Sequence, residues 1–338
     1  MKLFNVWKLF IISGVLIFFA VNPLSAQRSM TIRLASLVPE NTAWGQSINR
    51  LAAEWNRVTN GYLNVIVLHG GTAGDEAKVM GLLRSNQVQA AVLTSIGLNS
   101  VAPELFAISY PFLIRNDAEL DEVLKKIKPD LDARMHNSGF VSMALARAGW
   151  VKIFSKTPVV TPDDLRRIKF GTPSAEQDMM QAFRTLGYNV VPANLTETLF
   201  SFQSGRIDAT YLSPVYAAAQ QIFGIAGNMT SVNVAPFMGG ILMNEVTWRR
   251  IPENYRSSIL EASKRIEKDI EASIASLETE AITTMLKYGL KVNELSMQQN
   301  QMWYDDTARY ESRLVGSLFN REYYGKINNI LSEYRRGR

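Results

Sequence analysis

Residues 151–170 read VKIFSKTPVVTPDDLRRIKF, and this stretch indicates an α/β fold. It opens with an apolar segment of strand type, 151–154, and closes with a second one, 168–170. Between them, Thr161 is followed by Pro162 and two acidic residues. This order is typical of a helix start, because threonine caps the first turn and the acids favour its positive end.

The same alternation of strands and helices extends over most of the chain. The expected strands cover 31–37, 62–68, 88–94, 140–146, 189–192 and 207–211, and the expected helices cover 42–60, 75–86, 117–135, 174–187 and 196–204. The segment 88–94 is almost continuously apolar, as in a strand that is covered on both faces of a sheet. Two runs of this pattern predict two α/β lobes with a ligand-binding cleft between them.

One long helix is expected over 253–286, a stretch without proline or glycine. At about 1.5 Å per residue it would be about 50 Å long, so we expect it to bridge the two lobes. Lobe I is predicted to comprise 27–149 with 238–275, and lobe II 150–237 with 276–320. Residues 296–334 are predicted to be helical, and residues 321–338 are predicted to form a C-terminal tail that is solvated at 335–338.

The first 26 residues have the pattern of an export signal. Lys2 and Lys8 precede an apolar run at 9–21, and Ala26 offers a small residue for cleavage. The run is shorter than the roughly 20 residues that a membrane-spanning helix needs. We therefore expect a periplasmic protein, with retention of the segment as an N-terminal anchor as the alternative.

The composition excludes several classes of chemistry. The 338 residues include no cysteine and only two histidines, His69 and His136, so the protein is not a lipoprotein and carries no cysteine- or histidine-rich metal site. The glycine-rich loop at 69–74 lacks the lysine of a phosphate-binding loop. A net charge of +5, of which two charges fall in the signal, is too low and scattered for nucleic-acid binding. The sequence thus predicts a binding protein without catalytic residues, metal or cofactor.

Several short segments, in a fixed order, carry a family resemblance. They are TIRLA (31–35), WG (44–45) with NGYLNV (60–65), HGGTAGDE (69–76), PEL (103–105) with YPFL (110–113), FSKTPVVTPDDLRRIK (154–169), QSGRIDA (203–209) and WRRIPE (248–253). From about residue 31 to about residue 320 the chain resembles the DctP-type solute-binding proteins of TRAP (tripartite ATP-independent periplasmic) transporters. The resemblance implies a two-lobed, flytrap-like α/β fold that closes on a small ligand, usually an organic acid, and delivers it to a membrane permease.

The chain departs from this family where the ligand carboxylate is bound. Gly171 and Val151 stand where the family typically has arginines, and Leu212 stands where it often has an asparagine. Each charge-assisted hydrogen bond of an arginine to a carboxylate contributes about 1.5–3 kcal/mol. We therefore expect a neutral or hydrophobic ligand, with space at Gly171. The alternative is a conventional organic acid bound by another cation, with Arg147 and Lys152 as candidates.

The family's cleft maps onto strand ends and helix starts of this sequence. The predicted ligand-binding residues are Ser36, Asn41, Trp44, Gly70, Ser95, Trp150, Val151, Gly171, Thr172, Tyr211 and Ser213. For Trp44 and Trp150, packing in a domain core is the competing interpretation. A periplasmic carrier or sensor that passes its ligand to a non-permease protein is a second functional hypothesis. A hydrolase is a third, for which no nucleophile–base pair is found.

Overall fold

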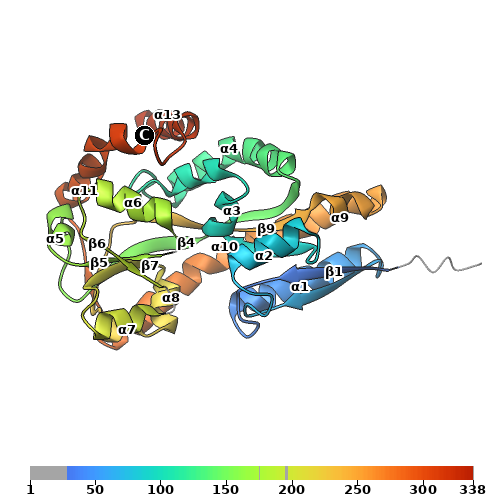
Figure 1. The fold of residues 1–338 in the computed structure, drawn as a ribbon, viewed down its shortest axis with the longest axis horizontal. Coiled ribbons are helices and arrows are strands. Elements are labelled where there is room, and N and C mark those ends of the chain that lie inside the picture. The colour runs from blue at the N-terminus through green and yellow to red at the C-terminus, as the bar shows by residue number, and fades with distance from the viewer. Residues whose placement is uncertain (1–28, 175, 195–196, 338) are drawn as a thin grey trace, which may run out of the picture.

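The computed structural model describes residues 29–174, 176–194 and 197–337 (Figure 1). The predicted export signal, residues 1–26, lies outside them. None of the helices in the described ranges is both long and apolar enough to cross a membrane.

Within the described residues, eight strands are hydrogen-bonded one to the next, in two groups that belong to the two lobes. Their order is β2-β1-β3-β9-β4-β7-β5-β6, and β8 and β10 pair beside it. The bounds are β1 Met30–Ala35, β2 Leu63–Leu68, β3 Ala90–Thr94, β4 Phe140–Ser155, β5 Phe170–Pro173, β6 Val190–Ala193, β7 Ala209–Leu212, β8 Asn228–Thr230, β9 Ala235–Asn244 and β10 Lys291–Asn293. The first lobe contains β1–β3, and the second contains β5–β7 (Figure 1).

Strand β4 belongs to both lobes, which differs from the two separate strands expected at 140–146 and 151–154. It pairs with β9 over most of its length and with β7 near its end. The pairing shifts register between Arg147 and Trp150, where Gly149 has a φ of +108°. Glycine adopts this backbone conformation without strain, so the chain bends there and the strand continues into the second lobe.

The helices lie on both faces of the two strand groups. Their bounds are α1 Ala43–Val58, α2 Glu76–Arg84, α3 Ser95–Asn99, α4 Asp117–Asn137, α5 Pro162–Arg166, α6 Gln177–Thr185, α7 Thr198–Gln203, α8 Pro214–Ala219, α9 Glu245–Arg250, α10 Glu253–Lys287, α11 Met297–Arg309, α12 Glu311–Leu314 and α13 Arg321–Arg336, with 3₁₀ turns η1 Pro103–Ser109 and η3 Ile222–Gly224. Helix α5 begins with a capping box between Thr161 and Asp164. Helix α6 begins at Gln177, three residues later than the start expected at 174.

Helix α10 runs past both lobes, within one residue of the expected bounds. It packs against α1, β4 and α8. The Trp55 indole of α1 donates a hydrogen bond to Ser263 of α10 at 3.0 Å. Farther along, the Glu278 carboxylate accepts one from the backbone N–H of Trp150 at 2.7 Å. The helix thus holds β4 close to its bend.

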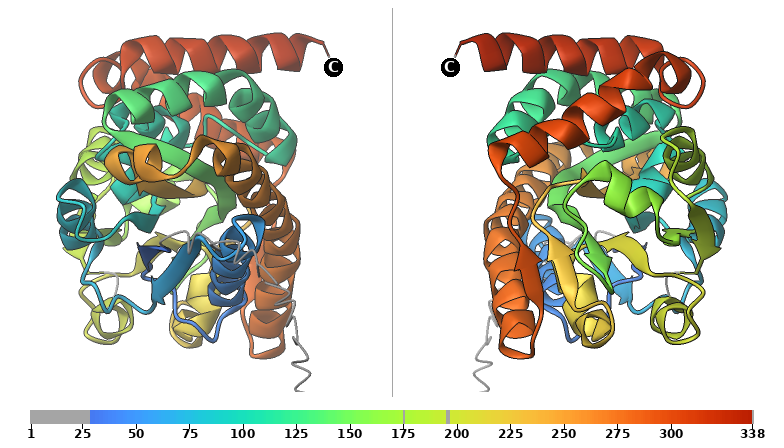
Figure 2. Two further views of the ribbon diagram at one scale, coloured as in Figure 1. Left: turned by 90° about the vertical axis from the view of Figure 1, so that its right-hand side faces the viewer. Right: turned by 90° about the vertical axis from the view of Figure 1, so that its left-hand side faces the viewer.

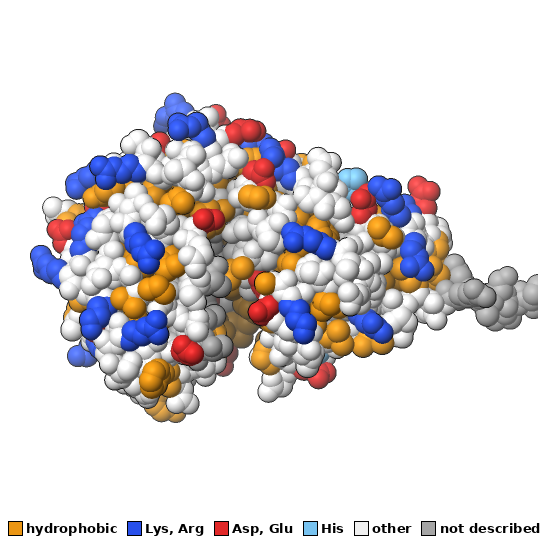
Figure 3. All heavy atoms as spheres, viewed as in Figure 1, with side chains coloured by type: hydrophobic (Ala, Val, Ile, Leu, Met, Phe, Trp, Pro, Cys, Tyr) orange, Lys and Arg blue, Asp and Glu red, His pale blue; other side chains and the backbone are white. Residues whose placement is uncertain are grey.

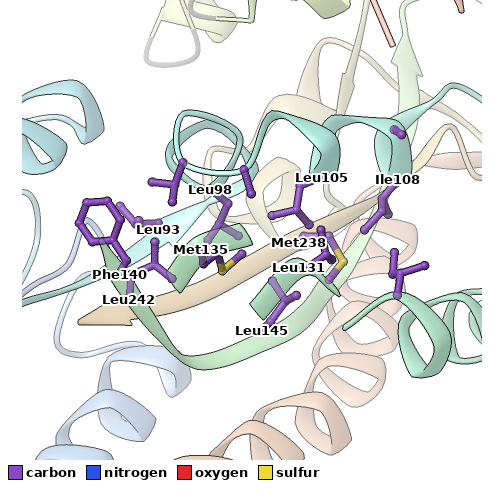
Figure 4. Packing of buried hydrophobic residues seen from close by; sticks show 14 of the residues in the cluster. Leu93, Leu98, Leu105, Ile108, Leu131, Met135, Phe140, Leu145, Met238 and Leu242 are labelled. Carbon is purple, nitrogen blue, oxygen red and sulfur yellow. The ribbon is translucent and has the colours of Figure 1, made fainter. Parts of the chain in front are cut away.

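An apolar cluster under α4 forms one core of the first lobe. Figure 4 shows Leu131 and Met135 of α4 facing Leu242 of β9 and Leu145 of β4. All four side chains are at most 2% exposed. This packing fixes the β3–β9–β4 strands whose ends reach the cleft.

Residues 321–336 form helix α13 on top of α4 (Figure 2), which agrees with the helical pattern expected up to residue 334. The solvated end expected at 335–338 is wrong for Arg335. Tyr323, Ile327 and Leu331 repeat every four residues and bury one face of the helix. In its last turn, Arg335 donates two hydrogen bonds of 2.8 Å to the nearly buried carboxylate of Glu119. The last turn of α13 is therefore held by packing and by the ion pair of Arg335 with Glu119.

Candidate ligand-binding cleft

A cavity of about 370 Å³ lies between the two lobes, and Figure 3 shows the hollow that separates them on this face. The first lobe contributes α3 and η1, and the second contributes Val151, Tyr211 and the start of α6. The beginning of β9 and the segment after α12 complete the wall. The lining residues are Ser95, Ile96, Asn99, Ser100, Pro103, Phe106, Ser109, Val151, Glu176, Gln177, Asp178, Met179, Tyr211, Ala235, Pro236, Phe237 and Leu318.

The cavity wall is apolar and acidic. Most lining side chains are apolar, and the polar remainder is made of serines and amides apart from two carboxyl groups, Glu176 and Asp178. Lysine, arginine and histidine are absent from the described lining residues. A ligand carboxylate would therefore meet negative charge without a cationic partner.

Glu176 and Tyr211 form a polar pair in the wall. The Tyr211 hydroxyl donates a hydrogen bond to the Glu176 carboxyl, and the tyrosine ring packs on Phe183 at a centroid distance of 5.1 Å. Burial raises the pKa of the Glu176 carboxyl, and the Tyr211 hydrogen bond opposes this effect. Burial also raises the pKa of Tyr211. The pair therefore presents a desolvated acid to the cavity.

A buried carboxylate holds the opposite wall in place. Glu76 of α2 accepts hydrogen bonds from the Thr94 and Gly97 backbone N–H groups at 2.6 and 2.8 Å, and from the Thr94 hydroxyl at 3.0 Å. Burial raises the pKa of Glu76, against these hydrogen bonds. The loop that it fixes carries Ser95 and Ile96 into the cavity.

The structure brings three of the predicted residues, Ser95, Val151 and Tyr211, into this cavity. Ser95 is also tied to β9, because its hydroxyl lies 3.3 Å from both the N–H and the carbonyl oxygen of Met238. The other eight predicted residues are not among its lining residues.

Trp150 packs in the core of the first lobe, as its competing interpretation predicts. Its side chain is 6% exposed within the cluster under α4, and its indole N–H donates to Asp117 at 2.7 Å. Neighbouring residues on a strand point to opposite faces, so Val151 reaches the cavity where Trp150 does not.

The expected space at Gly171 is wrong. A Cβ atom on this glycine would lie 2.9 Å from Cδ1 of Ile207, which already fills the position. The next residue, Thr172, is fully buried, and its hydroxyl has no hydrogen-bond partner among the described residues. Where the family typically has an arginine, this chain thus has a glycine packed against Ile207, and the described residues leave no empty pocket there.

The remaining predicted residues lie at turns and helix caps. Ser36 is buried after β1 and accepts a hydrogen bond from Val38 at 3.1 Å. Ser213 caps α8 through the Tyr216 N–H. Asn41 is exposed, Trp44 is partly buried in the first turn of α1, and Gly70 forms a turn with a φ of +62°.

Neither candidate for a replacement cation lines the cavity. Arg147 forms an ion pair with Asp117 at 2.7 Å. Lys152 donates to the carbonyl oxygen of Ser231 at 2.6 Å, and burial lowers the pKa of its amine to about 8. Both cations are engaged with the protein itself.

The acids Glu176 and Asp178 at the start of α6, the β9 residues and Leu318 were not predicted from the sequence. Glu176 and Asp178 resemble ordinary charges of a first helical turn, so no local signal distinguishes them. Leu318 lies 107 residues after Tyr211 and 167 residues after Val151 in the sequence, so no local pattern connects it with them. Within the described residues, no group of histidine and acidic side chains could hold a metal ion.

Comparison with known proteins identifies the family. Residues 34–314 match the DctP family model, described as bacterial extracellular solute-binding protein, family 7. The chain belongs to this family. Its members are transport receptors that bind small molecules, in contrast to enzymes.

Solved TRAP solute-binding proteins share the fold. The protein from Ochrobactrum anthropi is 19% identical with a TM-score of 0.83, over 92% of this chain and 98% of that one. The protein from Sulfurospirillum deleyianum, with bound succinate, is 20% identical with a TM-score of 0.75, over 90% and 98%. Among curated relatives, the C4-dicarboxylate-binding protein DctB of Bacillus subtilis is 20% identical over 82% of this chain and 80% of its own length.

Proposed function

We propose that this DctP-family protein is an exported periplasmic receptor that captures a small neutral or hydrophobic ligand between its lobes and delivers it to a TRAP-type permease. Family membership supports the receptor role, and the predicted signal at 1–26 supports export. The proposal includes the lobe boundaries given above, with lobe I at 27–149 and 238–275 and lobe II at 150–237 and 276–320.

The observation that carries the ligand class is the cation-free lining of the described cavity wall. A buried carboxylate without a cationic partner loses several kcal/mol of hydration free energy. Glu176 and Asp178 add repulsion to this cost. Neutral polar groups, in contrast, find hydrogen-bond partners in the serine and amide side chains, and an apolar body finds Phe106 and Phe237.

Structural neighbours with bound succinate and β-D-galacturonate motivate the alternative of a conventional acid receptor. It would require a cation that enters the cavity when the lobes close. Arg147 and Lys152 would have to leave Asp117 and Ser231 to do so. A carrier role with a soluble partner protein draws no support from the described residues.

Calorimetric titration of the chain lacking residues 1–26 tests the proposal. Succinate, D-galacturonate and octan-1-ol are compared at the same pH and ionic strength. We expect binding of the alcohol and none of the acids at millimolar concentration. Micromolar binding of either acid would contradict the ligand class.

The substitution Val151→Arg tests the same reasoning in the opposite direction, because it places a cation in the cavity wall and should create binding of an acid. In a Glu176→Gln background, which removes one of the two acids among the described lining residues, the new guanidinium should confer measurable succinate binding. An arginine at exposed Val246, outside the cavity, should leave succinate binding unchanged.

A further inference from the structure

Glu176 is a largely buried acid that has no cationic partner within the described residues. Three acids with side chains at most 13% exposed pair with cations at 2.6–2.8 Å: Glu119 with Arg335, Glu267 with Lys128, and Asp306 with Arg166. Glu76 has no cationic partner in the part of the chain that the structure describes, but it accepts three hydrogen bonds. For Glu176 the described residues supply one hydrogen bond, from the hydroxyl of Tyr211.

This single hydrogen bond leaves most of the accepting capacity of Glu176 unused. An ionised carboxyl group has about four lone-pair sites, and Tyr211 occupies one of them. The tyrosine cannot turn away freely, because its ring is packed between Phe170 and Phe183 at centroid distances of 5.8 and 5.1 Å. The carboxyl group is therefore held in position at the cavity wall, ready to accept further hydrogen bonds.

The rest of the cavity favours a donor that carries positive charge. Asp178 adds a second negative group on the same helical turn, and the described lining residues add no positive one. Asp178 lies in the first turn of α6, where a negative charge is stabilised by the helix dipole, so the helix by itself explains an acidic residue there. Glu176 precedes the helix and makes no capping hydrogen bond to it, so the helix does not explain its position.

We propose that the ligand of this receptor ends in a protonated amine that binds the carboxylate of Glu176, and that its apolar body lies against Phe106, Phe237 and Leu318. This inference rests on the receptor role and the cation-free cavity of the proposed function, and it gives the hydrophobic ligand a positively charged end. The cavity of about 370 Å³ is at the small end of ligand sites in proteins, so the ligand is a compact amphiphilic amine.

Three probes with the same eight-carbon chain separate the possibilities: octan-1-amine, octan-1-ol and octanoate. Their affinities are measured by calorimetric titration at pH 8, where the amine is protonated. We expect the amine to bind about tenfold tighter than the alcohol, since a charge-assisted hydrogen bond is stronger than a neutral one by this order. Octanoate should bind weakest.

The variant Glu176→Gln removes the charge and retains an acceptor for Tyr211. It should weaken octan-1-amine binding by about tenfold and leave octan-1-ol binding unchanged. Glu322→Gln, at a 74% exposed side chain on α13, is the control and should change neither affinity.

The outcomes separate this inference from the proposed function. Equal affinity for amine and alcohol, or no binding of the amine, would overturn the amine assignment. If the alcohol still binds, the proposed function of a receptor for neutral or hydrophobic ligands stands. An equal loss for both probes in Glu176→Gln would also overturn it. Tightest binding of octanoate would overturn both proposals.

Discussion

Replacement of Glu76 should loosen one wall of the cavity and destabilise the fold. All three partners of this carboxylate, the two N–H groups and one hydroxyl of the Thr94–Gly97 turn, are hydrogen-bond donors. In Glu76→Gln the new amide NH₂ must face at least one of them. In Glu76→Ala both backbone donors lose their acceptor.

The magnitude follows from the cost of a buried donor without a partner, about 1–3 kcal/mol each. We expect a loss of unfolding free energy of about 1–3 kcal/mol for Glu76→Gln, which leaves one donor unpaired, and of about 2–6 kcal/mol for Glu76→Ala, which leaves both backbone donors unpaired. The ligand should bind more weakly in both variants, because Ser95 and Ile96 lie on the released turn.

Urea denaturation monitored by circular dichroism measures the stability, and titration with octan-1-ol measures the affinity. Glu322→Gln serves again as the exposed control. If Glu76→Gln were as stable as the parent and bound the probe equally well, the turn would not depend on this carboxylate, and the reasoning would be refuted.

Three further predictions concern residues around the cleft. Burial lowers the pKa of Lys152 to about 8, although the charge of Glu278 opposes this, so between pH 8 and 10.5 the unfolded state binds more protons than the folded state. The free energy of unfolding should therefore rise over this pH range by up to about 3 kcal/mol. Urea denaturation measures this rise, and it should be absent in the variant Lys152→Met. Gly171→Val should lower the unfolding free energy by about 1–3 kcal/mol through overpacking, and an unchanged thermal midpoint would contradict the filled position. Arg335→Ala removes the partner of buried Glu119 and should cost about 1–3 kcal/mol, whereas a truly solvated tail would show no change in calorimetric stability.

The sequence predicted the local elements well, because their signals are local. The capping residues at Thr161 and the uninterrupted stretch of α10 depend on neighbours along the chain, and both appear as expected. The lining residue Val151 followed from a departure from the family pattern.

The parts that could not be predicted depend on contacts distant in sequence. The space at Gly171 is filled by Ile207, 36 residues farther along the chain. Arg335 was expected in solvent because its partner, Glu119, lies 216 residues away. The role of Glu176 becomes visible only when the cavity wall is assembled around it.

The central claim is that the cleft receives a ligand without negative charge. The most direct measurement is mass spectrometry of the small molecule released when the purified receptor, residues 27–338, is denatured. The account predicts a neutral or amine-bearing molecule with an apolar body. If the molecule is an amine, it should no longer co-purify with the Glu176→Gln variant. Release of a stoichiometric mono- or dicarboxylate would contradict the account.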